Sequence, residues 1–320
     1  MFKSQTKVNR FAEHHLDSLA LIYGFRKYKR DYAGGLSISM PSIMDKLLNR
    51  FLLRLPILRA LNARYISCYV PVQSESLNTR HVNSATIVIP VRNEAGNIER
   101  LKAATTEILA AIPNSEVIFV EGNSHDTSYQ DLSTWINGIE NKAVRLLKQD
   151  GKGKRDAVEK GFDASNKPYL AIVDADLTVG LSDSIEAIKI GMASPSTMIN
   201  CVRTGFPMEK DAMRFFNYIG NRAFSGLLSF ICKQKIGDSL CGTKCMSRDF
   251  YLKLKSSGYW DNAKDPFGDF SILFGASRFG HEILNYTVKY YARTSGAPNI
   301  SRWLDGLKLL KLSFREFMLP

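Results

Sequence analysis

The sequence predicts an α/β protein with a Rossmann-like, mostly parallel sheet that is flanked by helices. Two observations support this prediction. From Ala85 onward, short apolar runs rich in β-branched residues alternate with segments of helical periodicity, as in parallel sheets with right-handed crossovers. The apolar runs also end in polar or acidic residues, and ligands of parallel sheets bind beyond the carboxyl ends of the strands.

The expected elements follow one another in a regular order. The four expected strands are ATIVIPV (85–91), EVIFVEG (116–122), AVRLLKQD (143–150) and YLAIVDADL (169–177). The expected helices are 97–112, 155–165 and 183–192, and LNYTVKY (284–290) is an expected edge strand. Runs of this kind that stop at charged residues are typical of strands buried on both faces.

Residues 1–80 differ from the rest of the chain, because they are basic and mostly helix-like. They predict a helical N-terminal extension, joined by the polar stretch 72–84 to a domain that spans 81–320. Within the extension, Met44–Arg64 has leucines at helical spacing with arginines between them, and Pro56 interrupts it. This segment either packs on the main domain or a partner, or lies as an amphipathic helix on anionic lipid.

The charge balance narrows the classes of partner. Lys plus Arg number 43 and Asp plus Glu number 31, which gives a net charge of +12. Such a protein favours anionic partners, including nucleotide sugars, nucleic acid and lipid phosphates. No signal peptide or run of about 18 apolar residues is present, and the five cysteines form no paired framework. We therefore expect a cytoplasmic protein whose contact with the inner face of the cell membrane is at most peripheral.

Asp174 and Asp176 close the apolar run IVDAD at the end of the fourth expected strand. Two neighbouring carboxylates in a buried setting repel one another, and a divalent cation removes the repulsion. Mg²⁺ or Mn²⁺ prefers oxygen ligands and keeps positions open for phosphate oxygens. A solvated turn explains an isolated Asp-X-Asp equally well, but its position favours a metal that neutralises a diphosphate leaving group.

The segment Gly151–Arg155 (GKGKR) stands at the start of an expected helix. Its glycines allow close backbone approach, and the helix N-terminus and three cations suit an anion. The spacing is not that of a Walker A loop. A plain basic loop is the alternative interpretation.

Three further segments carry weaker signals. PVRNE (90–94) and EGNSHDT (121–127) close strands one and two with carboxylates and amides that suit a ribose or a base, although turns and helix caps use the same residues. Asp269 stands among aromatic residues, which suits either a general base or a helix cap. Arg293 and Arg302 suit a phosphate clamp, or are ordinary surface arginines.

In this order, the segments resemble the family 2 glycosyltransferases and, within them, the dolichyl-phosphate mannose synthase-like branch. The matching segments, between about residues 85 and 310, are TIVIPVRNEAGNI, VIFVEGNSHDTS, GKGKRDAVEKGFDAS, YLAIVDADL, SLCGTKCMSRDFY, DPFGDFSILFGAS and YARTSGAPNISR. The resemblance implies a GT-A fold, hexosyl transfer from a nucleoside-diphosphate sugar, a divalent cation (Mg²⁺ or Mn²⁺) and inversion at the anomeric carbon. It implies a polyprenyl-phosphate or glycan acceptor and a place in cell-envelope glycan biosynthesis.

The resemblance also assigns site residues by position. It implies metal binding by Asp174 and Asp176, with Asp174 also on the donor, and acceptor-side positions at Gly242 and Thr243. It implies catalytic roles for Asp269 as the acidic base and for Arg293 and Arg302 near a phosphate. The donor-binding positions that it implies are Pro90, Arg92, Glu94, Glu121, Lys152 and Arg155. The chain departs from many members at Glu121, which opens EGNS in place of DDGS, and at Asp269, where GDF replaces ED.

Two other functions fit parts of the sequence. A nucleotidyltransferase uses a similar sheet and metal, but needs a Gly-rich loop where this chain has PVRNEAGN. A basic protein that binds nucleic acid or a membrane surface suits the charge of +12. No helix-turn-helix, RNP or zinc-finger pattern is present, so we expect no nucleic-acid partner.

Overall fold

The computed structural model describes residues 25–32, 65–71, 82–205, 213, 215–260, 265, 267–295 and 302–318. It describes side chains for residues 82–205, 213, 217–260, 265, 267–295 and 306–318. The chain divides into two compact units. One unit is Leu16–Asn78, and the other contains the sheet and its helices from Thr79 onward.

The smaller unit contains a pair of antiparallel strands, β1 (Phe25–Tyr32) and β2 (Tyr65–Pro71). The sequence analysis expected mostly helix here, and these two segments are strands instead. YISCYVP is rich in aromatic and β-branched residues, which favour a paired strand over a helix. The amphipathic segment 44–64 lies outside the described residues, and the domain boundary at residue 80 stays a prediction.

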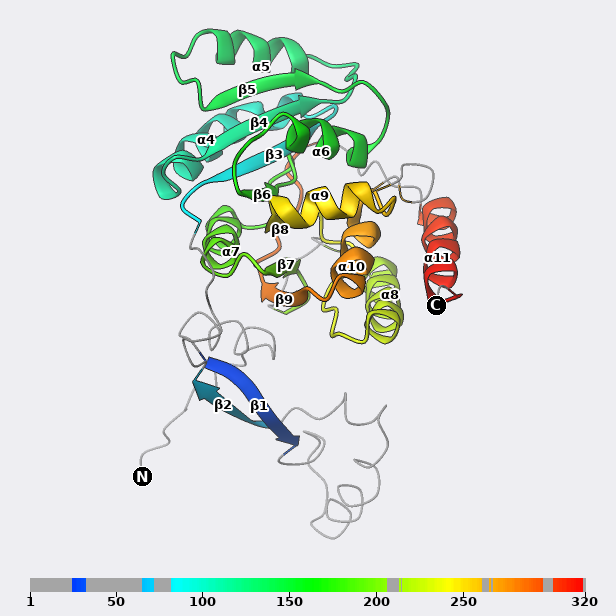
Figure 1. Cartoon of the computed structure of the whole chain (residues 1–320). Helices are drawn as coiled ribbons and strands as arrows, with labels where there is room; N and C mark the ends of the chain where they lie inside the picture. The colour runs from blue at the N-terminus through cyan, green and yellow to red at the C-terminus, as the bar shows by residue number, and fades with distance from the viewer. Residues whose placement is uncertain are drawn as a thin grey trace, which may run out of the picture. The chain divides into compact units, whose positions relative to one another are not determined.

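The larger unit is built on a sheet that has seven strands among the described residues (Figure 1). Its strands are β3 (Ala85–Val91), β4 (Glu116–Glu121), β5 (Val144–Lys148), β6 (Tyr169–Ile172), β7 (Thr197–Val202), β8 (Lys244–Ser247) and β9 (Glu282–Thr287). They lie in the order β5-β4-β3-β6-β8-β7-β9. All neighbouring pairs are parallel except those that β8 makes with β6 and β7. The predicted mostly parallel sheet is thereby confirmed.

Helices cover both faces of this sheet (Figure 1). They are α4 (Ile98–Ala111), α5 (Ser128–Asn137), α6 (Lys154–Asp163), α7 (Leu181–Ala193), α8 (Phe215–Cys232), α9 (Arg248–Ser256), α10 (Asp269–Arg278) and α11 (Arg302–Met318), with a short 3₁₀ turn η3 (Ala95–Asn97) before α4. Helices α4, α5 and α7 pack side by side, α9 packs against α10, and α8 lies between α10 and α11. Among the described residues, no helix combines the length and apolarity that crossing a bilayer needs.

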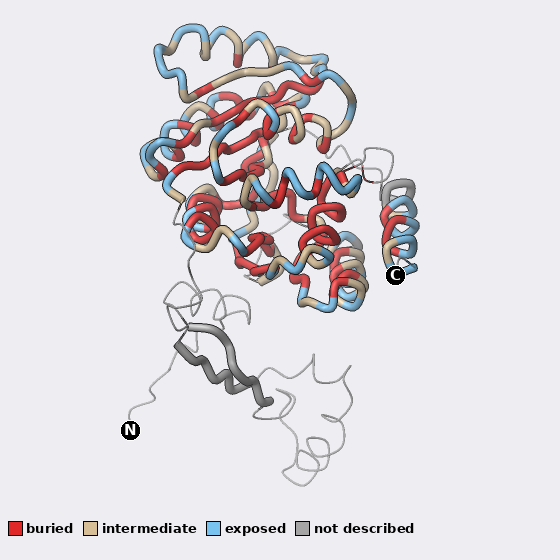
Figure 2. The backbone as a smooth tube through the Cα atoms, in the orientation of Figure 1, coloured by how far each residue is buried: buried red, intermediate tan, exposed pale blue. Residues whose placement is uncertain are grey.

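The alternation of side chains along β4 shows how the two layers of helix are held. Phe119 points toward α5, where its ring meets Trp135 at 5.9 Å between centroids. Val120 points the other way, toward α6. There Gly161 packs so closely on Val88 and Val120 that a side chain at position 161 would press against both. Period-two alternation thus gives each strand two buried faces, and Figure 2 shows buried residues concentrated along the strands.

The predicted strands agree with the structure in place, and several differ in their bounds: β5 is shorter than the expected 143–150, and β6 is much shorter than the expected 169–177. The first expected strand matches β3 in both bounds, and the expected edge strand overlaps β9, which lies at the end of the sheet. The fourth expected strand ran to residue 177, but β6 ends at Ile172. Beyond it the chain turns, because the Leu177 N–H donates to the Asp174 carbonyl and Leu177 adopts a φ of 50°. The two aspartates therefore lie in a turn beyond the strand.

Candidate active site

The polar loops that follow β3 and β4 are joined to one another at the carboxyl edge of the sheet. The backbone N–H of Asn93 donates to Ser124 Oγ at 3.0 Å, and the N–H of His125 donates to Asn93 Oδ1 at 2.8 Å. The N–H of Ala95 donates to Asp126 Oδ2 at 3.1 Å. Asn93 also has a φ of 56°, which asparagine tolerates better than most residues. The sequence thus builds one hydrogen-bonded rim from two loops whose joined residues are 31 positions apart.

Asp174 lies on this edge in contact with two segments that come from elsewhere in the chain. Its Oδ1 accepts from Lys154 Nζ at 2.5 Å, and Lys154 is the first residue of α6. A side chain at Gly242 would collide with both Asp174 and Lys154, so the glycine is what lets the loop before β8 approach them. Burial opposes ionisation of Asp174, but Lys154 outweighs it, and the pKa of this carboxyl lies below its usual value.

Asp176 is almost fully buried and forms a second charged cluster beside the first. Its Oδ1 accepts from the N–H and the hydroxyl of Thr178, at 3.0 and 2.9 Å. Its Oδ2 accepts from Arg293 at 2.5 Å, and Arg293 also pairs with Glu94 at 3.3 Å. Burial raises the pKa of Glu94 above its usual value, against the opposing effects of Asn97 and Arg293.

The segment 288–295 carries Arg293 to this position by crossing the turn after β6. The N–H of Tyr291 donates to the Thr178 carbonyl at 2.8 Å, and Val179 and Tyr290 form an isolated antiparallel bridge. At the far end, Thr294 Oγ1 accepts from Arg100 at 2.6 Å. We call this segment the C-terminal strap. The strap holds Arg293 against Asp176 and Glu94. Residue spacing in the sequence does not reveal this contact.

Asp269 begins α10, and its closest cation is Lys244 of β8. Lys244 is fully buried, its Nζ lies 3.2 Å from Asp269 Oδ1, and it also donates to the Cys241 carbonyl. Asp269 Oδ1 accepts no hydrogen bond, and neither does the buried Thr243 Oγ1. Asp269 is thus a buried carboxylate that is paired with a buried lysine and whose Oδ1 has unused capacity to accept a hydrogen bond.

A bidentate pair between Arg203 and Asp238 supports the same region, and the sequence analysis missed it. Arg203 Nε and its NH2 group donate to the two oxygens of Asp238 at 2.8 and 3.0 Å, and Asp238 is fully buried. The Arg203 guanidinium also lies over the Tyr290 ring of the strap, at 5.1 Å. Nothing in the spacing of these residues marks them, because they lie 35 positions apart.

The remaining predicted donor-binding residues take several positions. Glu121 is buried at the end of β4 and accepts from the Ser124 N–H, and Pro90 is level with Val120 in the sheet. Arg92 and Lys152 have exposed side chains on the rim.

Arg155 is buried away from the acidic pair. It donates to the Trp260 carbonyl at 2.7 Å and pairs with Glu159 at 3.0 Å. Arg302 begins α11, and its side chain lies outside the described residues.

The charged groups of the site thus meet in a short chain of contacts. Lys154 touches Asp174, Asp174 lies against Gly242, and the loop of Gly242 is tied through Lys244 to Asp269. The field of Asp269 also contributes to the raised pKa of Lys154, although burial opposes it. The predicted metal pair, acceptor loop and base therefore lie on one edge of the sheet.

The part of the sequence that forms most of this edge of the sheet matches a known family. A profile described as glycosyl transferase family 2 matches residues 86–251, which is just over half of the chain. The chain belongs to glycosyl transferase family 2. A search of curated protein sequences finds no match.

Solved structures share the fold of this family 2 chain. Glucosyl-3-phosphoglycerate synthase from Mycobacterium tuberculosis, in complex with Mn²⁺, uridine diphosphate and phosphoglyceric acid, has a TM-score of 0.53 and 13% identity over 74% of this chain and 80% of that chain. A further structure of the same synthase has a TM-score of 0.53 and 12% identity over 74% and 82% of the two chains. A structure described as a mycobacterial protein has a TM-score of 0.53 and 13% identity, covering 74% and 76%. These likenesses confirm the GT-A fold.

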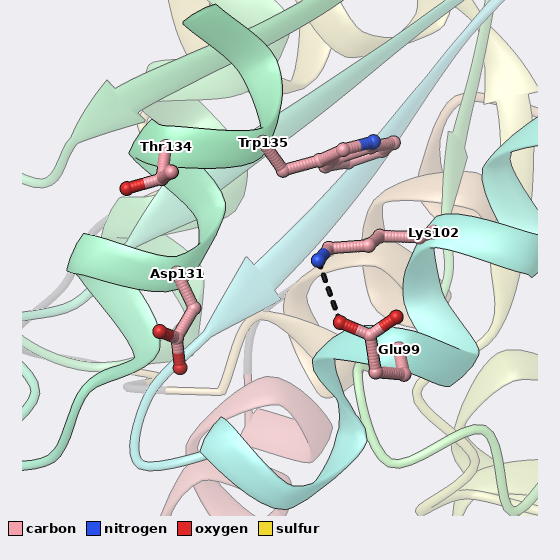
Figure 3. A pocket seen from close by; sticks show the side chains of 5 residues that line it. All are labelled: Glu99, Lys102, Asp131, Thr134 and Trp135. Atoms are coloured by element: carbon pink, nitrogen blue, oxygen red, sulfur yellow. Dashed lines mark hydrogen bonds and ion pairs between the residues drawn. The ribbon is translucent and has the colours of Figure 1, made fainter. Parts of the chain in front are cut away.

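A pocket of about 250 Å³ lies between α4 and α5 (Figure 3). Glu99 and Lys102 of α4 form an ion pair at 2.6 Å on one side of it. Asp131, Thr134 and Trp135 of α5 line the other side. Neither helix carries a predicted site residue, although Arg100 of α4 donates to the Asp176 carbonyl at 3.2 Å.

The acidic pair, Asp174 and Asp176, supplies oxygen ligands of the kind that a hard divalent cation prefers. Both carboxylates also have protein partners: Asp174 accepts from Lys154 and packs against Gly242, and Asp176 accepts from Thr178 and Arg293. No group of three or more His, Cys, Asp or Glu side chains is placed to hold a metal in the part of the chain that the structure describes. Two protein carboxylates, with phosphate oxygens completing the shell, is a usual arrangement for Mg²⁺ bound together with a substrate.

Proposed function

We propose that the protein is an inverting glycosyltransferase that moves a sugar from a nucleoside-diphosphate sugar to a phosphorylated, lipid-linked or glycan acceptor. The observation that carries the proposal is the meeting of Asp174, Asp176, Lys154 and Arg293 at one edge of the sheet. Two carboxylates, each paired with its own cation, are suited to a divalent cation and a diphosphate together. Family membership makes glycosyl transfer the expected reaction, in place of nucleotidyl transfer or nucleic-acid binding.

We assign Asp174 and Asp176 as the groups that would hold Mg²⁺ or Mn²⁺. When bound, such an ion neutralises the charge that develops on a diphosphate leaving group. A solved synthase of similar fold contains Mn²⁺, UDP-glucose and phosphoglyceric acid, which supports a divalent cation, a nucleotide sugar and an acidic acceptor here. Lys154 and Arg293 already touch the acidic pair, so both cations are placed to stabilise the phosphates electrostatically.

We assign the donor's nucleoside to the rim formed by the loops after β3 and β4. Pro90, Arg92, Glu94 and Glu121 stand on that rim or at the strand ends beneath it. Exposed Lys152 is free to meet the donor from the loop before α6, and Arg155 anchors that loop through Trp260 and Glu159.

On the acceptor side, we assign Asp269 as the base. Its Oδ1 accepts no hydrogen bond and lies 3.2 Å from Lys244 Nζ, and we propose that an acceptor hydroxyl donates its proton to this carboxylate beside the lysine. Gly242 and Thr243 form the wall between this carboxylate and Asp174. The acceptor oxygen then attacks the anomeric carbon on the face opposite the diphosphate, in a single displacement that inverts the configuration.

We place Arg302 at the acceptor phosphate. We retain the dolichyl-phosphate mannose synthase-like branch, with a polyprenyl-phosphate acceptor and hexosyl transfer, as the specific hypothesis.

We also propose a cytoplasmic location and a role in the biosynthesis of cell-envelope glycans. Four cysteines, at positions 201, 232, 241 and 245, are buried free thiols, which suits a reducing compartment. Burial raises the pKa of Cys241 to about 12, so this thiol is unreactive beside the site.

A donor screen tests the proposal. Nucleoside diphosphate release is measured with Mn²⁺ or Mg²⁺, with and without polyprenyl phosphate or phosphoglycerate, and released pyrophosphate would instead indicate nucleotidyl transfer. Asp176→Asn keeps an acceptor for Thr178 but weakens the acidic pair, and we expect turnover to fall by about 100-fold or more. Asp249→Asn, on the exposed first turn of α9, is the matched control. Full turnover by Asp176→Asn in excess chelator would contradict the metal role.

A further inference from the structure

Helix α11 divides lengthwise into three faces. Leu309, Leu312 and Ser313 are buried and pack the helix onto the body of the domain. An apolar face points outward, and its members are Leu307, Leu310, Phe314, Phe317 and Met318, all of them exposed. Leu307 and Phe314 are 68% and 67% exposed, so this face has no covering within the described residues.

Helix α8 extends the same apolar surface. Ile219 and Phe230 of α8 are 47% and 69% exposed, and the ring of Phe230 lies 5.9 Å from that of Phe317. The two helices pack against each other along one side of the domain (Figure 1). We call these seven exposed residues the α8–α11 surface. Single exposed apolar residues are ordinary, but a continuous group of this kind marks an interaction site.

Basic side chains of α11 lie beside the α8–α11 surface. Exposed Lys308, Lys311 and Arg315 each follow an apolar residue of α11 by one position, and successive residues of a helix are about 100° apart. They therefore form a basic face along the apolar one. Helix α8 contains no acidic residue, and the Glu316 carboxylate of α11 accepts from Tyr259 at 2.9 Å.

We propose that the α8–α11 surface docks on an anionic lipid bilayer. A helix with an apolar face, a basic face beside it and aromatic rings on the apolar side is suited to the boundary between headgroups and acyl chains. The basic row gives each bound molecule several contacts with anionic headgroups. A second copy of the chain is a poorer occupant, because a symmetric contact would bring the two basic rows together.

Docking through this surface would bring the acceptor side of the site to the membrane. On the inner side of α8, Asn221 Oδ1 accepts from the N–H and the hydroxyl of Ser239, both at 3.1 Å. Ser239 is three residues before Gly242, and Phe224 of α8 packs on Phe270, the neighbour of Asp269. This consequence rests on the proposed function, whereas the docking itself does not.

Vesicle flotation of the full chain tests the docking. We expect wild type to float with vesicles of phosphatidylcholine and phosphatidylglycerol at low salt, and to float weakly with phosphatidylcholine alone. Leu307→Ser with Phe314→Ser should lower binding by about tenfold or more. Lys311→Gln with Arg315→Gln should lower it by about fivefold for each charge removed. All four positions are exposed, so the variants should keep the wild-type melting temperature.

The matched controls are Leu252→Ser on α9, 45% exposed, and Lys142→Gln, also exposed; both should float like wild type. Wild-type flotation by the α11 variants would overturn the proposal and point to another membrane segment. A wild-type dimer that the Leu307/Phe314 variant converts to a monomer, without flotation, would assign the surface to a second copy and also overturn it. Nucleoside diphosphate release in solution, measured on the same variants, keeps the failure of docking distinct from a failure of the proposed function.

Discussion

Gly242→Ala tests how closely the acceptor loop and the acidic pair must fit. A Cβ at position 242 would lie 2.6 Å from Asp174 Oδ1 and closer still to Asp174 Oδ2 and Lys154 Nζ. Side chains do not tolerate a Cβ within about 3.0 Å, so the Asp174–Lys154 pair or the loop has to retreat by several tenths of an ångström or more. The change falls on the carboxylate that we assign to the metal and donor.

The expected effect is on turnover more than on folding. Misplacement of a reacting group by about 1 Å costs on the order of 100-fold in rate, or about 2.7 kcal/mol of activation free energy. The Lys154 side chain ends in a flexible group that is able to move aside, so we expect the unfolding midpoint to stay within a few degrees. The assay is nucleoside diphosphate release under saturating donor and Mn²⁺, with thermal unfolding measured in parallel.

Gly220→Ala provides the matched control for the same exchange. A Cβ at Gly220 would meet nothing within 4 Å, and the residue lies inside α8. Alanine there should raise stability by about 0.5–1 kcal/mol and leave turnover unchanged. Wild-type turnover by Gly242→Ala would refute the reasoning, because the loop would then not be pressed against a working Asp174.

Three other predictions follow from the buried charges. Burial alone raises the pKa of Asp238, but Arg203 holds it below the usual 3.8, so the ionised carboxylate stabilises the fold above that value and the contribution is lost as the pH falls through the lowered pKa. Asp238→Asn should therefore lower the free energy of unfolding, measured with urea at neutral pH, by about 3–5 kcal/mol. The difference in stability between wild type and variant should close only below pH 3.8, and closure well above that pH would contradict the pairing. Lys244→Met and Asp269→Asn should each lower the free energy of unfolding by about 3 kcal/mol, because each leaves a buried charge unpaired. The double variant should lose clearly less than the sum of the two, and additive losses in a double-mutant cycle would contradict the pairing. Arg155→Met should lower the melting temperature, because it removes the contact with Trp260, and a raised KM for the donor with unchanged melting would instead place its guanidinium on the donor.

The sequence predicts the donor half of the fold well, because its elements have local signals. ATIVIPV becomes β3 residue for residue, since a β-branched run between polar residues has few other stable conformations. The run YLAIVDADL was predicted too long, because periodicity does not show that Leu177 closes a turn on Asp174. The two carboxylates were nevertheless placed at the correct edge.

The acceptor half was predicted poorly, because its structure depends on contacts between distant residues. TMINCV (β7) and KCMS (β8) are short, and β8 exists because it pairs with both β6 and β7. The Arg203–Asp238 pair and the arginine held by the C-terminal strap arise from tertiary packing, which no spacing rule encodes. Contacts join Asp174 to Gly242 and, through Lys244, the loop of Gly242 to Asp269, which periodicity alone does not predict; the roles that the family resemblance implies for these residues stay predictions.

The reversed direction of β8 has a consequence for how such a site can change. Because β8 runs against its neighbours, residues that enter it lie at the edge where β6 and β7 exit, and Lys244 is level with Ile172. The loop from Ser239 to Thr243 therefore reaches Asp174 from a strand other than those that precede the two polar loops of the rim. If the proposed roles hold, insertions or exchanges in that loop should alter the acceptor without disturbing the strands proposed to hold the donor, which makes the loop a separable target for laboratory evolution.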